Sequence, residues 1–256
     1  MRDEAAQPPR ESWSRVGDAI VHAWECGPLT AQRGTVVLLP GLGLPRYLHR
    51  VSSAVGALGL RSVLLDLPGF GRRAGSGVAP DIDEIGGAAA AWVRRHVTGP
   101  VVVAGHSTAA QAALAAGLLL QECVAPLAVV LGAPTFRPPH RRWGRLLLAT
   151  PAAYRRDPPS ELLIAAPDLL RGHRNVVRVL LSGMADAPEE SVRGLTVPLV
   201  LTAGRLDTYA PGTWLHTLRA AALRSPSVRV VQLEGSHNNP YTRPAQVARV
   251  LCSALP

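Results

Sequence analysis

The feature that most constrains the fold is a regular alternation of short apolar segments with helix-like segments along almost the whole chain. The apolar segments are continuous runs at residues 19–25, 35–39, 62–67, 100–104, 126–132, 197–203 and 227–233. Such runs are typical of strands buried on both faces of a parallel sheet. Helix candidates lie at 46–58, 81–96, 108–121, 212–224 and 241–254. The alternation predicts an α/β fold with a mostly parallel, twisted sheet and helices on both faces.

One segment interrupts this alternation. Residues 137–190 contain no convincing strand, and their amphipathic helical pieces, such as 143–150 and 174–183, are separated by prolines. A connection of this length with helices of its own is more often a lid or cap than a plain loop. We therefore expect an α/β core formed by residues 1–136 and 191–256, with a helical cap inserted at 137–190.

The strongest chemical signal is Gly105-His106-Ser107-Thr108-Ala109, between a predicted buried strand and an alanine-rich helix. A nucleophilic serine on so sharp a turn needs small residues two positions before and after it, and Gly105 and Ala109 are small. The helix N-terminus also favours negative charge that develops beside Ser107. The alternative is that Ser107 merely caps the helix, and the string alone does not separate the two interpretations.

Two further strand ends supply the groups that a serine nucleophile needs. Serine requires a base, usually a histidine that is oriented by a carboxylate. Asp207 follows the predicted strand at 197–203, and His237 follows the one at 227–233. Because parallel strands present their ligand-binding loops at their carboxyl ends, we expect Ser107, Asp207 and His237 to meet there.

In these features the chain resembles the α/β-hydrolase family, over nearly all of its length outside the insertion. The resemblance implies a serine hydrolase in which Ser107 is the nucleophile, His237 is the general base and acid, and Asp207 orients His237. The implied reaction cleaves a carboxylic ester, lactone or thioester and needs no cofactor or metal. The same triad also serves C–C bond hydrolases and cofactor-free acyl transferases, and a non-catalytic small-ligand receptor can keep the fold.

Two more segments match the family. Residues 38–43, Leu-Leu-Pro-Gly-Leu-Gly, correspond to its oxyanion loop, although Pro40 stands where the family usually has histidine. The resemblance assigns the oxyanion hole to the backbone N–H groups of Leu42 and Thr108, and backbone donors do not depend on that histidine. Residues 66–71 match the family's D-x-P-G-x-G turn, which we interpret as structural.

Other assignments of the triad are weaker. The strand at 126–132 ends without a carboxylate, so it offers no alternative acid. Asp66 is expected on the opposite side of the nucleophile strand from His237. His106 is adjacent to the nucleophile, where a packing role is more common than a catalytic one. The remaining histidines do not follow a strand in the required way.

The substrate pocket is expected from loops beside the triad and from the insertion. Those loops contain Tyr209, Trp214 and Asn238, and the insertion contributes Trp143, with Leu146, Tyr154, Leu163 and Met184 as further apolar candidates. The alternative for the insertion residues is that they form its own small core.

The charge of the chain raises the question of an anionic partner. The net charge is +9, and all 27 basic residues are arginines, which also fits the codon bias of a GC-rich genome. Between residues 137 and 178, nine arginines face three acids. They could steer an anionic substrate or form a solvated helix face. An aromatic content of 4% and the lack of a recognisable module argue against a nucleic-acid partner.

The composition also limits which other classes of protein the chain can belong to. A hydrophobic content of 47% excludes a disordered chain, and no uninterrupted apolar run is long enough for a membrane span. Three cysteines without C-x-x-C spacing favour a reducing compartment over a disulfide framework or a zinc site. We expect a cytoplasmic monomer or homodimer that acts on a small acyl substrate, without a membrane partner.

Overall fold

The structure is a computed structural model that describes residues 9–28, 33–66, 79–155 and 157–256. Its centre is one eight-stranded sheet with the order β1-β2-β4-β3-β5-β6-β7-β8. The strands are β1 (Arg10–Val16), β2 (Ala19–Cys26), β3 (Thr35–Leu39), β4 (Arg61–Asp66), β5 (Val101–His106), β6 (Leu127–Gly132), β7 (Leu199–Gly204) and β8 (Val228–Leu233). The β1–β2 and β2–β4 pairs are antiparallel and the others are parallel. The predicted class is therefore confirmed.

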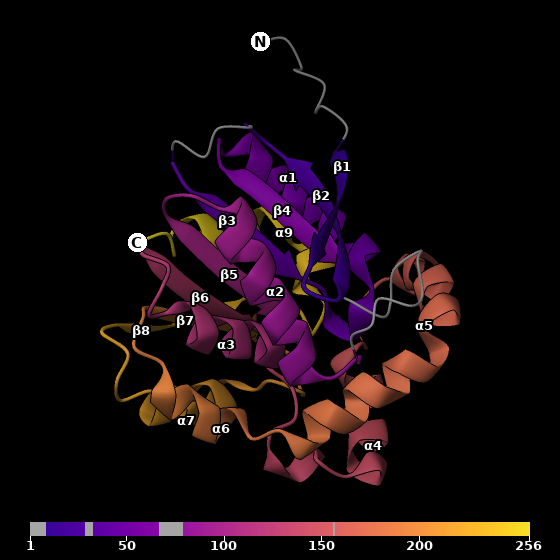
Figure 1. Cartoon of the computed structure of the whole chain (residues 1–256). Helices are drawn as coiled ribbons and strands as arrows, with labels where there is room; N and C mark the ends of the chain where they lie inside the picture. The colour runs from indigo at the N-terminus through magenta and orange to yellow at the C-terminus, as the bar shows by residue number, and fades with distance from the viewer. Residues whose placement is uncertain (1–8, 29–32, 67–78, 156) are drawn as a thin grey trace, which may run out of the picture.

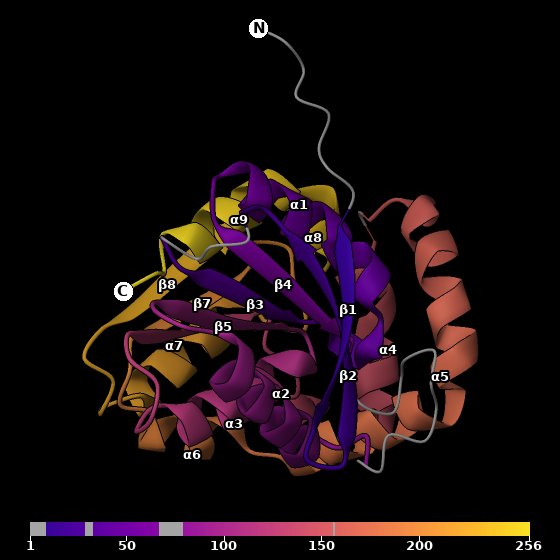
Figure 2. The same ribbon diagram turned by 45° about the horizontal axis from the view of Figure 1, so that its top comes forward.

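Helices cover both faces of the sheet (Figure 1, Figure 2). One face packs against α2 (Ile82–His96), α3 (Ala109–Leu120) and α7 (Gly212–Ala221), and the other against α1 (His49–Ala57) and α9 (Pro244–Cys252). The central strands send alternate side chains into the two layers, so that Val37 and Val103 face α2 and α3 while Val36 and Val102 face α1 and α9. Because both faces of these strands are buried, their sequences are continuous apolar runs.

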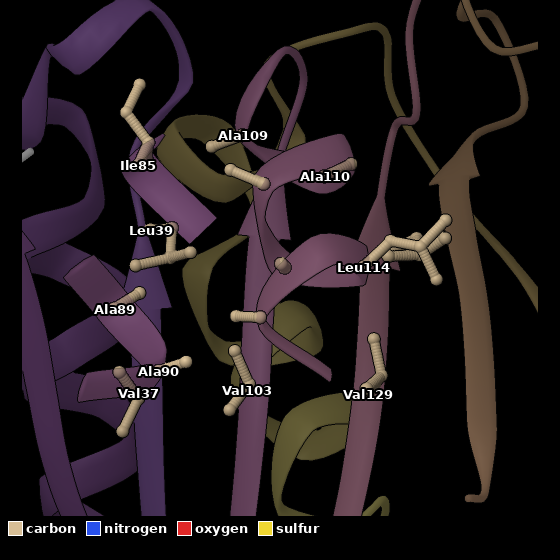
Figure 3. Close-up of a cluster of buried hydrophobic side chains, with 14 of the residues drawn as sticks. Val37, Leu39, Ile85, Ala89, Ala90, Val103, Ala109, Ala110, Leu114 and Val129 are labelled. Atoms are coloured by element: carbon tan, nitrogen blue, oxygen red, sulfur yellow. The ribbon is translucent and has the colours of Figure 1, made fainter. Parts of the chain in front are cut away.

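Small residues let α2 and α3 pack closely over the central strands. Figure 3 shows alanines of both helices beside Val37, Leu39, Val103 and Val129. At Gly86 of α2 a Cβ atom would lie 2.7 Å from the Cβ of Ala115, which real structures essentially never show. The close contact fixes α3, and with it the turn that joins β5 to α3.

The insertion at 137–190 lies between β6 and β7 and is mostly helical. It contains a short 3-10 helix (Pro138–His140), α4 (Trp143–Ala153), α5 (Pro159–Ala185) and the start of α6 (Pro188–Ser191). The prolines were expected to separate its helical pieces, but α5 continues through Pro167 and α4 through Pro151. Pro167 lacks the N–H that would bond the carbonyl one turn earlier, and the Leu163 side chain on that turn is 76% exposed.

Four short helices complete the described elements: 3-10 helices at Gly41–Gly43 and Pro45–Leu48 after β3, another at Val192–Gly194, and α8 (Asn239–Thr242) after β8. Within the described ranges, none of the helices combines the length and the hydrophobicity that crossing a bilayer requires. The D-x-P-G-x-G segment at 66–71 lies outside the described residues from position 67 onward.

Candidate active site

Ser107 occupies a sharp turn between β5 and α3. Its φ of 58° is in the left-handed region, which a non-glycine residue adopts only when its surroundings hold it there. Its N–H donates to the Gly132 carbonyl over 2.8 Å, which continues the β5–β6 ladder into the turn. At Gly105 a Cβ atom would lie 1.9 Å from the Ala109 carbonyl oxygen. The turn therefore tolerates no side chain at that position, as the motif requires.

The structure brings the three predicted catalytic residues together. The Nε2 atom of His237 lies 2.9 Å from the Ser107 Oγ, and its Nδ1 lies 2.9 Å from the Asp207 Oδ2. Ser107, Asp207 and His237 follow β5, β7 and β8, whose parallel register aligns their carboxyl ends. The side chains of Asp207 and His237 are almost fully buried.

Asp207 is held in its ionised form. Its Oδ1 accepts hydrogen bonds from the Tyr209 and Ala210 backbone N–H groups at 2.8 and 3.1 Å. Burial raises the pKa of the Asp207 carboxyl, but the charge and hydrogen bond of His237 and the two backbone donors outweigh it, so the pKa is lowered overall. An ionised Asp207 accepts a hydrogen bond from the His237 Nδ1–H. The ring proton thus stays on Nδ1, and the lone pair of Nε2 is free to accept the proton of Ser107.

A second buried histidine, His106, joins three parts of the site. The Gly41 N–H donates to the Tyr47 hydroxyl over 2.9 Å, and that hydroxyl lies 2.8 Å from His106 Nδ1. The His106 Nε2 lies 3.1 Å from the His237 backbone carbonyl, so it carries the proton. Burial, followed by the charge of His237, lowers the pKa of His106 to about 3. His106 is thus a neutral packing residue, as expected.

Tyr47 was missed by the sequence reasoning. It lies in the second 3-10 helix after β3, inside a segment that looked like the start of an ordinary helix. Its hydroxyl is the link between the oxyanion loop and His106. No sequence pattern marks it, because the link depends on a tertiary contact between residues far apart in the chain.

The residues assigned to the oxyanion hole lie beside Ser107. Leu42 has a φ of 53°, and its N–H donates to the Thr108 side-chain oxygen over 2.8 Å. Thr108 begins the turn into α3. The Leu42 N–H is therefore already aimed at an oxygen atom next to the nucleophile. An oxyanion role for Leu42 and Thr108 stays a prediction.

A cavity of about 580 Å³ opens beside Ser107 and His237. Its wall is mostly apolar: Leu42 and Leu44 come from the loop after β3, and Leu147, Tyr154 and Leu169 come from the insertion. Asn238 also lines it, as predicted, and so does the carboxyl-bearing Asp157. No arginine is among its described lining residues.

Three of the predicted pocket residues do not line this cavity, so that prediction is wrong for them. Trp143 is 39% exposed at the start of α4. Trp214 belongs to the core, where its Nε1 donates to the Pro134 carbonyl. Tyr209 packs edge-on against His237, with its hydroxyl 2.5 Å from the Thr150 Oγ1.

Two further apolar candidates, Leu146 and Met184, do not line the cavity either. They pack with Ala153 of the insertion and with Phe136 and Tyr209 outside it, in a small cluster that joins the insertion to the core. Leu163 is 76% exposed. The position of each of these side chains depends on how the insertion packs against the core, and no local sequence pattern indicates that packing.

The carboxylate that competes with Asp207 for the role of the acid, Asp66, lies beside a different histidine, His22. Asp66 ends β4, and its Oδ2 lies 3.9 Å from the Nδ1 of His22. Among the described residues, no group of three or more His, Cys, Asp or Glu side chains is placed to hold a metal ion.

A model of the alpha/beta hydrolase family matches residues 36–250 of this chain. No match was found among curated proteins. The solved structure of the enol-lactonase from Burkholderia xenovorans LB400 is similar, with a TM-score of 0.75 and 17% identity over 94% of this chain and 98% of that one.

Two further solved structures are similar over nearly their whole length. The thioesterase domain from the curacin biosynthetic pathway has a TM-score of 0.71 and 16% identity, over 96% of this chain and 99% of that one. E-2-(acetamidomethylene)succinate hydrolase has a TM-score of 0.73 and 13% identity, over 96% and 98% of the two chains. At such low identities, the likeness establishes the fold alone.

Proposed function

The chain belongs to the alpha/beta hydrolase family, and on that premise we propose that it is a serine hydrolase acting on a carboxylic ester, lactone or thioester. The observation that carries the proposal is the pair of 2.9 Å hydrogen bonds that join Ser107, His237 and Asp207. A helix cap, the alternative role for Ser107, needs neither a buried histidine at its hydroxyl nor a carboxylate behind that histidine.

The proposed reaction has two steps. The Ser107 Oγ attacks the acyl carbon while His237 Nε2 takes its proton, and His237 then gives this proton to the leaving oxygen or sulfur. Water deprotonated by His237 releases the acid and restores Ser107. Asp207, held ionised, stabilises the positive charge on His237 during both steps.

The oxyanion of each tetrahedral intermediate is proposed to bind the backbone N–H groups of Leu42 and Thr108. In the resting structure the Leu42 N–H donates to the Thr108 Oγ1. We expect the substrate oxygen to replace that hydroxyl as the acceptor, so that Leu42 is aimed correctly before the substrate arrives.

We propose residues 137–190 as a cap over this site and a neutral, largely apolar acyl group as the substrate. Leu147, Tyr154 and Leu169 of the insertion form part of the cavity wall. The volume of about 580 Å³ is within the roughly 300–1,000 Å³ of ordinary ligand sites. An apolar wall that includes Asp157 disfavours the burial of a second negative charge.

Turnover of p-nitrophenyl butyrate tests this function. The Ser107→Ala, His237→Gln and Asp207→Asn variants are each expected to lower kcat at least about a thousandfold. Asp66→Asn is the matched control, because Asp66 is a buried carboxylate at another strand end; its kcat should stay within roughly threefold of wild type. Equal loss in Asp66→Asn and Asp207→Asn would contradict the assignment of the acid.

A further inference from the structure

The insertion is hydrogen-bonded to the loop that carries Asp207. Near the end of α4, the Thr150 Oγ1 lies 2.5 Å from the Tyr209 hydroxyl, and the Ala149 carbonyl accepts a hydrogen bond from the Thr208 hydroxyl over 3.4 Å. Tyr209 in turn packs edge-on against the His237 ring, with ring centroids 4.9 Å apart. One end of α4 therefore supports the acid side of the triad.

The same part of the insertion also contacts the loop that carries His237. The His237 N–H donates to the Ala153 carbonyl over 3.3 Å, and the Tyr154 ring packs edge-on against the His237 ring at 5.4 Å. The Ser236 hydroxyl donates a hydrogen bond to the Asp157 Oδ1. Ser236 is almost fully buried, so water does not replace this bond freely.

Asp157 is anchored on both sides of His237. Besides the bond from Ser236, the Asn238 backbone N–H stabilises the ionised carboxylate. Burial is nevertheless the largest effect, and it raises the pKa of the Asp157 carboxyl. A partly buried carboxylate of this kind is a cost to folding that an apolar or amide side chain would avoid. Asp157 lies between the cavity and the loop that carries His237, so we look for a role at the active site that offsets this cost.

We propose that Asp157 is a positioning residue, which through Ser236 fixes the loop that presents His237 to Ser107. This inference rests on the proposed hydrolase function, and it makes the insertion a fixed part of the catalytic centre. Asp157 touches neither Ser107 nor Asp207 in any hydrogen bond described above, so its effect is transmitted through the backbone around His237. A displacement of His237 of about 1 Å is enough to cost roughly a hundredfold in rate.

A purely structural role for Asp157 makes different predictions. If the carboxylate only attached the insertion to the core, its removal would lower stability and alter substrate binding, because the insertion forms part of the cavity wall. If it positions His237, its removal lowers kcat while KM changes little. The acceptor oxygen, rather than the charge, should then be what matters.

Kinetics of five variants separate these roles. Asp157→Ala and Ser236→Ala should each lower kcat about tenfold or more, and the double variant should fall little further, since the two side chains act through one bond. Asp157→Asn keeps an acceptor for Ser236 and should recover most of kcat. Ser160→Ala is the control, because Ser160 makes another contact between insertion and core, 3.4 Å from the Tyr241 hydroxyl. Its kcat should equal that of wild type.

A second readout needs no substrate. In protein labelled with ¹⁵N-histidine, the ring signals that disappear in His237→Gln belong to His237. These signals should broaden or split in Asp157→Ala and remain single in Asp157→Asn and Ser160→Ala. Unchanged His237 signals and an unchanged kcat in Asp157→Ala would overturn the inference, as would equal losses in the alanine and asparagine variants. An inactive wild type with these same signal changes would instead count against the proposed function alone.

Discussion

Ser107 shows how one residue in an unfavourable conformation is held by its neighbours. Its positive φ follows from a backbone that turns directly from β5 into α3. The Gly132 carbonyl fixes the N–H of Ser107, and the close approach of Gly105 to Ala109 leaves no other path for the chain. Small residues at these two positions were read from the sequence because this requirement is local.

Replacing Gly105 tests whether this turn tolerates any side chain. Gly105→Ala places a Cβ atom 1.9 Å from the Ala109 carbonyl oxygen, which should cost at least about 3 kcal/mol, or roughly 6–12 °C in Tm. Gly87→Ala is the matched control, because nothing lies within 4 Å of the added atom on α2. It should raise stability by about 0.5–1 kcal/mol. Thermal unfolding of both variants checks the contrast.

His106 should make the protein sensitive to mild acid. Its pKa in the folded state is about 3, compared with 6.5 for an ordinary histidine, so the unfolded chain binds a proton that the folded chain does not. The free energy of unfolding should therefore fall as pH drops below 6.5. His106→Gln lacks this proton and should lose less stability between pH 7.5 and 5. Urea unfolding measures both, and parallel curves would contradict the neutral, buried histidine.

At the scale of elements, the strands and the helices of the core were predictable because each is encoded locally. The buried runs at 35–39, 100–104 and 197–203 coincide within two residues with β3, β5 and β7. The length of α5 could not be predicted in the same way, because Pro167 indicates a helix end that the structure does not have. Contacts made by α5 with distant parts of the core override the local signal, including the Arg46–Asp168 ion pair at 3.1 Å and the Ile82 N–H bond to Ser182.

The end of α5 offers a test of these contacts. The Gln111 side chain donates to the Asp186 carboxylate over 2.5 Å, yet burial, the largest effect, raises the pKa of Asp186 above its ordinary 3.8. The folded state thus holds the proton more tightly than the unfolded state. This carboxyl therefore lowers the free energy of unfolding as pH rises from 3.8 through the raised pKa of the folded state. Asp186→Asn keeps an acceptor for Gln111 and should exceed wild type in Tm at pH 7 but not at pH 3. A lower Tm at both pH values would contradict this account.

For the whole molecule, the positions of the triad could be predicted while the wall of the cavity could not. Ser107, Asp207 and His237 follow strands of a parallel sheet, so topology alone brings them to one edge. The wall depends on how the insertion packs, which explains why Trp143 and Trp214 were assigned to it wrongly and Asp157 was overlooked.

The described arginines of residues 137–178 do not line the cavity. Arg142, Arg145, Arg155, Arg174 and Arg178 of the insertion are exposed. Arg141 pairs with Glu189 at 2.5 Å instead of facing the cavity. Among the described lining residues of the cavity, Asp157 carries the acidic group and no arginine is present. A positive surface can still raise the encounter rate with anions, but it does not neutralise one inside the cavity.

The charge of the substrate tests this picture of the whole molecule. A p-nitrophenyl ester with a neutral acyl chain should have a kcat/KM at least about tenfold higher than an isosteric ester that ends in a carboxylate, because the apolar wall desolvates that charge without a partner. The two esters are compared at low and moderate salt. Preferential turnover of the anionic ester, weakened by salt, would show that an arginine reaches the substrate.

The central claim is that Ser107 is a nucleophile activated by His237. Reaction with a fluorophosphonate tests it most directly, since an activated serine oxygen displaces fluoride from the probe and becomes phosphonylated without requiring the natural substrate. We predict one adduct per chain by intact mass, located on Ser107 by peptide mapping, with no adduct in Ser107→Ala and much slower labelling in His237→Gln. Equal labelling of wild type and Ser107→Ala, or no labelling of wild type, would contradict the account.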